Sequence, residues 1–249
     1  MNEVIAKALG LQMNGFHTEA LKIFQKALQK EPMHSTLCEY YGSTLLSLGQ
    51  NKEAKKYLTR ALNKNIEKPQ VLNNLSTANQ ALGLFNEALL NAKSALKFKP
   101  DYQDAWVNLA NIHMDLKQWS EAIKAYKAAI NLDKDDQGPY LSLARAYLFN
   151  HEYDKALKLY KKHYTRFNDV AFLVGELICY RAKNDYPKAV DFSYKLKEKY
   201  DNELMWFEWV QTLWMANDKE RVKEESKKAI EKFGEYPALM SIVNLLEED

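Results

Sequence analysis

The sequence predicts an all-α fold built from repeated helix pairs, and three observations support this prediction. Alanine recurs every 34 residues, at Ala20, Ala54, Ala88, Ala122 and Ala156. Glycine (8 of 249 residues) and proline (6) are scarce, whereas a β-rich fold of this length needs many turn residues. The whole chain is 47% hydrophobic and 27% charged, which is ordinary for a folded protein, and it is rich in helix-favouring residues.

Each 34-residue interval is interpreted as one helix-turn-helix unit, because a fixed period of this length is typical of repeat architectures. In the second helix of a unit, another alanine follows the first after seven residues, at Ala27, Ala61, Ala95 and Ala129. The residue between them is Phe24, Leu58, Ala92, Tyr126 or Tyr160. Small residues let the two helices approach closely, and the larger residue fills the groove between them. Pro32 and Pro100 then end their units.

The first helix of each unit carries a large, large, small, large pattern. It is visible at Trp106, Leu109, Ala110 and His113, at Tyr140, Leu143, Ala144 and Tyr147, and at Cys38, Tyr41, Gly42 and Leu45. Turns are predicted at 48–51, 82–85 and 150–153. Gly49 and Gly83 occupy the place where a glycine commonly ends a helix.

These units resemble tetratricopeptide repeats, whose pattern has Trp, Leu, Gly and Tyr on the first helix and Ala, Phe, Ala and Pro on the second. The resemblance implies a right-handed α-solenoid superhelix whose first helices line a concave groove. We predict seven repeats, at 1–34, 35–68, 69–102, 103–136, 137–169, 170–202 and 203–236, and a C-terminal capping helix at 237–249. The last two repeats are degenerate, since Glu176 replaces a leucine and Val222 an alanine.

Polar groove positions of the third and fourth repeats are predicted to bind peptide; they are Asn73, Asn74, Thr77, Asn108 and Asn111. Asn74 and Asn108 stand at the same offset, and a side-chain amide offers both a donor and an acceptor to a peptide backbone. The pair resembles part of the asparagine ladder in the repeats of O-linked N-acetylglucosamine transferase and of importin-type solenoids. The alternative is that these asparagines serve the fold.

The C-terminal half of the groove is predicted to be more apolar, with Phe149, Phe207 and Trp214 facing the ligand. Packing between helices is the alternative for these three, and it is the preferred interpretation for Trp206 and Trp209, which fall at core offsets. Arg145 is placed to meet a ligand carboxylate or an intramolecular partner.

The function predicted from these features is a scaffold or adaptor that binds an extended peptide or a partner protein in the groove. One alternative is the substrate-recognition part, or the partner, of a peptide-modifying enzyme of the glycosyltransferase or sulfotransferase type. A second alternative is self-assembly as a homo-oligomer. The carboxylate clamp of chaperone-binding repeats matches at one of its five positions, so we do not expect a receptor for heat-shock chaperone tails.

Other classes of function are not favoured. The formal charge of +2, from 35 basic and 33 acidic residues, gives no reason to expect nucleic acid or an anionic membrane as a partner. Two cysteines, no signal-peptide pattern and no long apolar stretch predict a cytoplasmic protein without membrane insertion. The absence of helical His or Cys pairs and of glycine-rich phosphate loops predicts no metal, no cofactor and no enzyme activity. His113, His163, Cys38 and Cys179 are expected to be packing residues.

Overall fold

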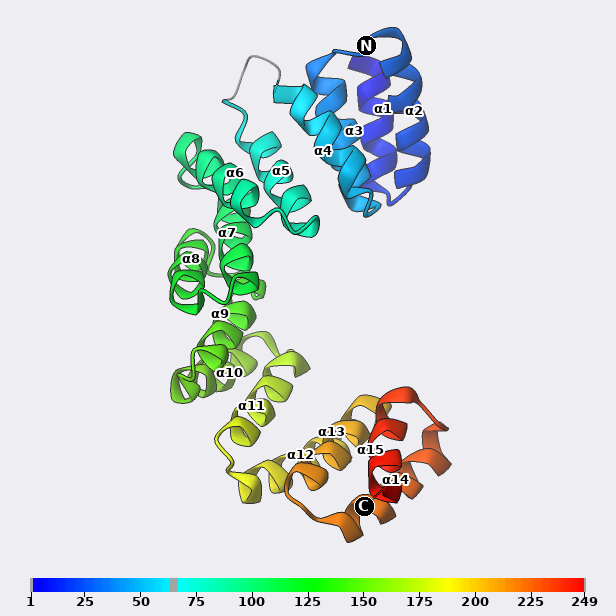
Figure 1. Cartoon of the computed structure of the whole chain (residues 1–249), viewed down its shortest axis with the longest axis vertical. Coiled ribbons are helices and arrows are strands. Elements are labelled where there is room, and N and C mark those ends of the chain that lie inside the picture. Colours follow the sequence, from blue (N-terminus) through cyan, green and yellow to red (C-terminus); the bar gives the residue numbers. More distant parts are fainter. Residues whose placement is uncertain (1, 63–66, 249) are drawn as a thin grey trace. The chain divides into compact units, whose positions relative to one another are not determined.

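A computed structural model describes residues 2–62 and 67–248, and all regular elements among them are α-helices (Figure 1). The helices are α1 (Asn2–Met13), α2 (His17–Lys30), α3 (Ser35–Ser47), α4 (Asn51–Leu62), α5 (Pro69–Ala81), α6 (Phe85–Phe98), α7 (Gln103–Asp115), α8 (Trp119–Leu132), α9 (Gly138–Phe149), α10 (Tyr153–Phe167), α11 (Val170–Ala182), α12 (Tyr186–Tyr200), α13 (Glu203–Met215), α14 (Lys219–Phe233) and α15 (Pro237–Glu248). They follow one another in antiparallel pairs, which confirms the predicted all-α repeat array. The chain divides into two compact units, Met1–Ala146 (unit 1) and Tyr147–Asp249 (unit 2), and α9 begins in the first and ends in the second.

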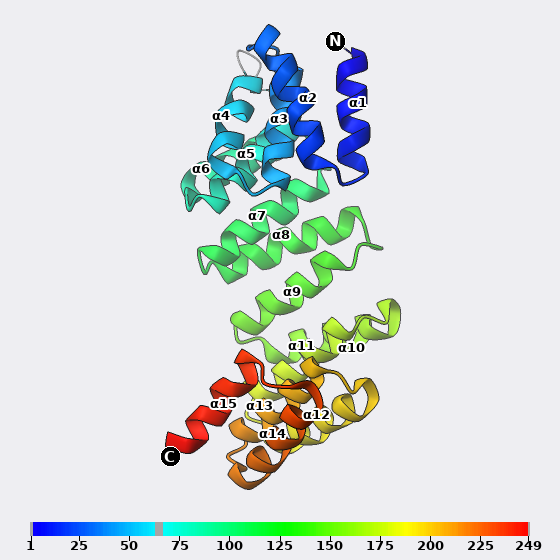
Figure 2. The ribbon, with the colours of Figure 1, turned by 90° about the vertical axis from the view of Figure 1, so that its right-hand side faces the viewer.

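Unit 1 repeats one packing arrangement. Helices α1, α3, α5 and α7 each pack against the helix that follows, and α2, α4 and α6 each pack against the first helix of the next pair. Figure 2 shows α7 and α8 lying side by side in this way. The alanines that recur every 34 residues, Ala20, Ala54, Ala88 and Ala122, have no exposed surface, because they lie where the paired helices approach most closely.

Close packing explains one glycine of unit 1. Gly42 lies within α3, and a Cβ atom added there would lie 2.7 Å from Cγ of Leu58 on α4. Leu58 is the larger residue between two small ones on α4 and is fully buried. The predicted complementarity of small and large positions is therefore present in atomic detail.

The turns within the helix pairs share a left-handed residue. Gly15, Gly49 and Gly83 hold positive φ angles of 71° to 82° in the first three pairs. The equivalent turns of the later pairs are made by Lys117, His151, Asn184 and Asn217, with φ of 56° to 61°. Glycine adopts this conformation at little cost, and asparagine tolerates it better than most residues. The predicted glycine helix stop thus holds for the early pairs, and the later pairs make the same turn with other side chains.

The core of unit 2 contains buried charged and aromatic groups. Arg181 of α11 and Glu208 of α13 form an ion pair of 2.6 Å, and both residues are more than nine-tenths buried. Arg181 also donates to Oε1 of Gln211 at 2.7 Å. Buried charges require this kind of pairing, because taking an unpaired charge out of water is costly.

A second polar group in unit 2 surrounds Lys197, which is 7% exposed. Its Nζ lies 4.3 Å from the centre of the Trp206 ring and 3.5 Å from a carboxylate oxygen of Glu225. Trp209 donates its indole N–H to Glu225 at 2.9 Å. Trp206 and Trp209 are buried, which confirms their predicted place in the core.

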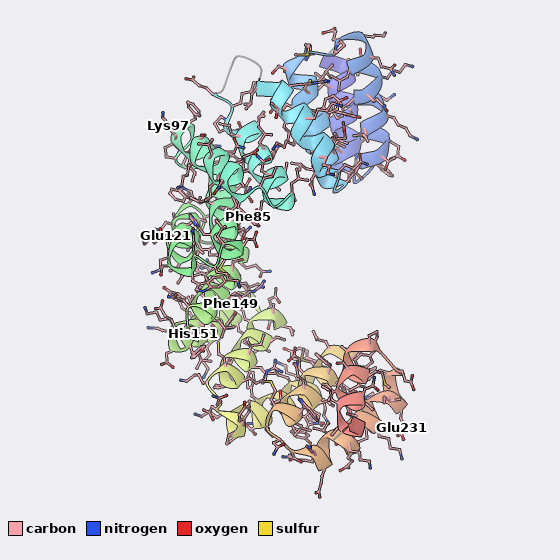
Figure 3. The ribbon with its side chains drawn as sticks, viewed as in Figure 1. Phe85, Lys97, Glu121, Phe149, His151 and Glu231 are labelled. Atoms are coloured by element: carbon pink, nitrogen blue, oxygen red, sulfur yellow. The ribbon has the colours of Figure 1, made fainter. Side chains whose placement is uncertain are left out.

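Other packing predictions are confirmed as well. Cys38, Cys179, His113 and His163 are buried. Lys97 of α6 and Glu121 of α8 are exposed and lie on the side of the second helices (Figure 3). Within the described ranges, no helix combines the length and the apolar character that crossing a bilayer would require.

Candidate functional site

A groove runs along the first helices of unit 1, and we call it the first-helix groove. It consists of two adjoining hollows of about 440 and 250 Å³. The larger hollow is lined by Asn73, Asp104, Val107, Asn108, Asn111, Asp136, Gly138, Pro139 and Ser142. The smaller one is lined by Gln80, Asn111, Met114, Asp115, Tyr126, Ser142 and Arg145. Because Asn111 and Ser142 belong to both hollows, the groove is continuous, and most of its lining comes from α5, α7 and α9.

Asn108 is held in the groove by a small hydrogen-bond network. Its Nδ2 donates to Oδ1 of Asn73 at 2.8 Å and to Oγ1 of Thr77 at 3.0 Å. Thr77 in turn donates to the backbone carbonyl of Asn73 at 3.3 Å. Asn73 is only 5% exposed. This network uses the donors of the Asn108 amide and leaves its Oδ1 without a hydrogen bond to any described residue.

At Asn111 the acceptor of the side-chain amide is occupied, whereas at Asn108 the donors are occupied. Tyr126 donates its hydroxyl to Oδ1 of Asn111 at 2.5 Å. Burial raises the pKa of Tyr126, against the opposing effects of Ser142 and Arg145, so the hydroxyl keeps its proton and can donate. The acceptor of Asn111 is therefore used, and its Nδ2 donates to none of the described residues. Asn108 thus offers an acceptor and Asn111 a donor, one helical turn apart on α7.

The charge of the groove is mainly acidic. Asp104 is exposed and makes no ion pair with a described residue. Asp115 accepts a hydrogen bond from Gln80 at 2.7 Å, and Asp136 accepts one from the backbone N–H of Gly138 at 3.0 Å. Neither bond neutralises the carboxylate, and Arg145 is the one cationic residue in the lining. The groove lining therefore carries a net negative charge.

The structure brings most of the predicted polar residues together. Asn73, Asn108, Asn111 and Arg145 line the groove, and Thr77 supports Asn108. Asn74 is half-buried and is not among the lining residues, so Asn73 is the residue of α5 that contacts Asn108. A role for Asn74 in ligand contact stays a prediction.

Two lining residues come from outside the first helices. Tyr126 lies on the second helix α8, and Asp136 precedes α9. The sequence places Tyr126 among the packing residues, and its ring is indeed 2% exposed. Its hydroxyl donates to Asn111 in the groove, and the repeat pattern gives no sign that a core tyrosine takes part in the lining.

The predicted apolar residues of unit 2 have different surroundings. Phe149, at the end of α9, is 45% exposed (Figure 3). Phe207 and Trp214 are half-buried and pack against the cluster that includes Trp206 and Trp209. The reason is that α15 packs on α13 and adds Leu239 and Ile242 to the same cluster. Whether Phe149, Phe207 and Trp214 contact a ligand stays a prediction.

Comparisons with known proteins agree with the repeat architecture. Two models of the tetratricopeptide repeat match the chain, at residues 104–136 and 39–63. Among curated proteins, no sequence relative is found.

Several solved structures are similar in fold, including structures described as tetratricopeptide repeat proteins. One from Parabacteroides merdae ATCC 43184 is 18% identical, covers 99% of this chain and 98% of its own, and has a TM-score of 0.73. PilF of Pseudomonas aeruginosa is 19% identical, with 82% and 93% covered and a TM-score of 0.66. YrrB, described as a tetratricopeptide repeat protein with an unusual peptide-binding site, is 15% identical, with 73% and 94% covered and a TM-score of 0.59. Identities this low show the fold alone, which is that of a tetratricopeptide repeat array. The two family matches show the repeat itself at residues 104–136 and 39–63.

Proposed function

We propose that the chain binds an extended segment of a partner protein in the first-helix groove of unit 1. Tetratricopeptide repeat proteins generally act as protein-interaction scaffolds, and one structure of similar fold is described by its peptide-binding site. The observation that carries the proposal is the pair formed by Asn108 and Asn111, one with an unused acceptor and the other with an unused donor.

An extended peptide is the ligand that this pair suits. Its backbone presents N–H and C=O groups along one edge, and these match an acceptor and a donor that stand one turn apart on a helix. The hydrogen bonds to Asn73, Thr77 and Tyr126 fix the orientation of both amides before the ligand arrives. Preorganisation of this kind lowers the entropic cost of binding.

The charge of the groove aspartates indicates which side chains we expect in a bound segment. Asp104 and Asp136 lie beside Asn108 in the same hollow, and Asp115 lies in the adjoining one. We expect the bound segment to carry Lys or Arg near the residue whose backbone the asparagines contact. Charge complementarity adds more to specificity and association rate than to affinity, so the affinity is expected to be micromolar.

The test is a selection from a library of random 12-residue peptides displayed on phage, with the full chain as bait. Selected peptides are synthesised with a fluorescent label, and their dissociation constants are measured by anisotropy for wild type and for Asn108→Ala/Asn111→Ala. Two hydrogen bonds of about 0.5–1.5 kcal/mol each predict that the double variant binds at least about five-fold more weakly.

Asn131→Ala is the matched control, because Asn131 is an exposed asparagine of the second helix α8 outside the groove. It should leave the affinity unchanged, and circular dichroism should show equal helix content in all three proteins. Selected peptides that bind the double variant as tightly as wild type, or that lack basic residues, would overturn the proposal.

A further inference from the structure

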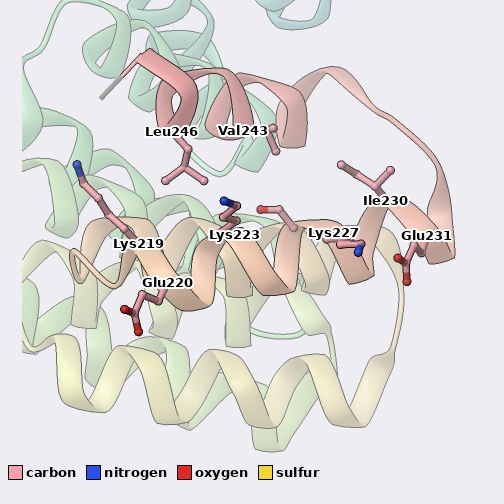
Figure 4. Close-up of a pocket in the computed structure, with 9 residues that line it drawn as sticks. Lys219, Glu220, Lys223, Lys227, Ile230, Glu231, Val243 and Leu246 are labelled. Carbon is pink, nitrogen blue, oxygen red and sulfur yellow. The ribbon is translucent and has the colours of Figure 1, made fainter.

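A second and larger groove lies between α14 and α15 in unit 2, and we call it the α14–α15 groove. Its volume is about 960 Å³. The lining residues are Lys219, Glu220, Lys223, Ser226, Lys227, Ile230, Glu231, Val243 and Leu246. Figure 4 shows Val243 and Leu246 projecting from α15 towards α14. With Ile230 these side chains form an apolar wall, and all three are half-buried.

Lysines stand along this wall at helical spacing. Lys219, Lys223 and Lys227 follow one another every four residues, so they share one face of α14. Lys223 and Lys227 are exposed and form no ion pair with a described residue. Glu220 and Glu231 also line the groove, but Figure 4 shows their carboxylates pointing away from α15. The side of the groove that a ligand would meet is therefore basic.

The floor of the α14–α15 groove holds an unsatisfied polar atom. Ser226 is 3% exposed, and its Oγ has no hydrogen-bond partner among the described residues. Buried hydroxyl groups in folded proteins usually find a partner. A polar group of a ligand lying between Lys223 and Lys227 would provide one.

We propose that the α14–α15 groove binds an amphipathic helix of another protein, with an apolar face against Ile230, Val243 and Leu246 and acidic residues facing the lysines. The lined part of α14, from Lys219 to Glu231, is roughly 18 Å long at 1.5 Å per residue. That length accommodates about three turns of a bound helix. An apolar stripe flanked by one sign of charge is the usual complement of a helix-binding groove. The site uses no residue of the first-helix groove and does not depend on the proposed function.

The α14–α15 groove does not suit the first helix pair (α1 and α2) of a second copy of the chain. The first helix pair has its own groove of about 410 Å³, lined by Val4, Lys7, Ile23, Lys26, Ala27 and Lys30. Joining this end of one copy to the α14–α15 groove of another would bring two rows of lysines together. Like charges in close contact oppose such an association, so a partner of opposite charge is favoured.

The experiment uses the full chain and a synthetic helix as the probe. The probe is a labelled 16-residue alanine-based peptide with leucines at helical spacing on one face and glutamates along both flanks. A second peptide carries lysine in place of each glutamate. Fluorescence anisotropy in low salt should show micromolar binding of the acidic peptide and at least ten-fold weaker binding of the basic one. Lys223→Glu/Lys227→Glu should weaken binding of the acidic peptide at least ten-fold and strengthen binding of the basic peptide.

The control is Lys158→Glu/Lys162→Glu on α10, which makes the same change in net charge at two exposed lysines four residues apart and away from the groove. It should change the affinity for the acidic peptide less than two-fold. Asn108→Ala/Asn111→Ala should also leave it unchanged, which separates this proposal from the proposed function. Equal losses in the two lysine variants, no preference for the acidic peptide, or self-association that depends on Lys223 and Lys227 would each overturn the proposal.

Discussion

Replacing Gly175 by alanine should destabilise the protein, although alanine is the better helix former. Gly175 lies within α11, and a Cβ atom added there would lie 2.2 Å from Cε1 of Tyr160 on α10. Cβ atoms essentially never approach another atom closer than 3.0 Å. Gly10, within α1, is the matched comparison, because a Cβ atom there would have nothing within 4 Å.

Both substitutions gain helix propensity, but only Gly175→Ala also forces extra volume into a packed core. Replacing a glycine inside a helix by alanine stabilises the helix by about 1 kcal/mol. At Gly175 the Tyr160 ring must also move, but it is 2% exposed and packs edge-on against the buried Phe172, with ring centres 6.5 Å apart. Forcing extra volume into such a core costs about 1–3 kcal/mol, and a contact this short belongs at or above the upper end. We therefore expect Gly175→Ala to lose about 2 kcal/mol or more and Gly10→Ala to gain about 1 kcal/mol.

The assay is urea denaturation of the full chain, followed by circular dichroism and by tryptophan fluorescence. Two probes are needed because repeat arrays do not always unfold in one step. Trp206, Trp209 and Trp214 lie in unit 2 and report on the part of the chain that contains Gly175. If Gly175→Ala raises the unfolding midpoint as Gly10→Ala does, α10 and α11 are not packed at this distance and the reasoning is refuted.

Two further predictions concern buried titratable groups. Burial, with a smaller contribution from Glu176, raises the pKa of Cys179 to about 12, and burial also raises the pKa of Cys38. Both thiols should therefore react with a disulfide reagent at pH 8 far more slowly in the folded chain than in urea, and fast labelling of either in the folded chain would contradict this. Burial, with Lys162 and Arg166 nearby, lowers the pKa of His163 below its usual 6.5, so the unfolded chain binds the proton more readily than the folded one. The stability from the neutral imidazole should be complete above pH 6.5 and should fall as the pH drops towards the folded pKa, by about 1.4 kcal/mol for each unit of difference. His163→Phe should show a smaller loss of urea midpoint between pH 7.5 and 5.5 than wild type, and equal losses would count against this account.

The helix pairs are predictable from the sequence because the residues that define them must be small or large for steric reasons. Ala54 and Ala88 recur because a larger side chain there would separate the paired helices. The turns are less predictable. A glycine at positions 49 and 83 predicts a left-handed backbone conformation. Lys117 and His151 adopt the same conformation, although neither residue type predicts it. Their conformation follows from the packing of the two helices that they connect.

The sequence predicts the pairing of the groove asparagines to within one residue. Counting offsets pairs Asn74 with Asn108 across a 34-residue interval, but the structure pairs Asn73 with Asn108, and Gln80 with Asp115, across 35 residues. The repeat period relates equivalent positions, whereas contacts between neighbouring first helices depend on the angle at which those helices cross. The crossing angle cannot be derived from positions within the repeat. These positions therefore identify the helix faces that form the groove but not which side chains contact each other.

The degenerate repeats show how a fold tolerates departures from its own pattern. Glu176, which replaces a leucine, is 7% exposed and accepts a hydrogen bond from Tyr180 at 2.8 Å. Glu208 is paired with Arg181 and Glu225 with Trp209, so each of these three buried carboxylates has a polar partner on its own helix or on another helix of unit 2. Replacing both members of such a pair by apolar residues is often tolerated, but replacing one leaves the other buried and unpaired. A single replacement at these positions is therefore expected to destabilise unit 2 more than a paired one, and the paired polar side chains let the helices pack where the apolar repeat pattern is lost.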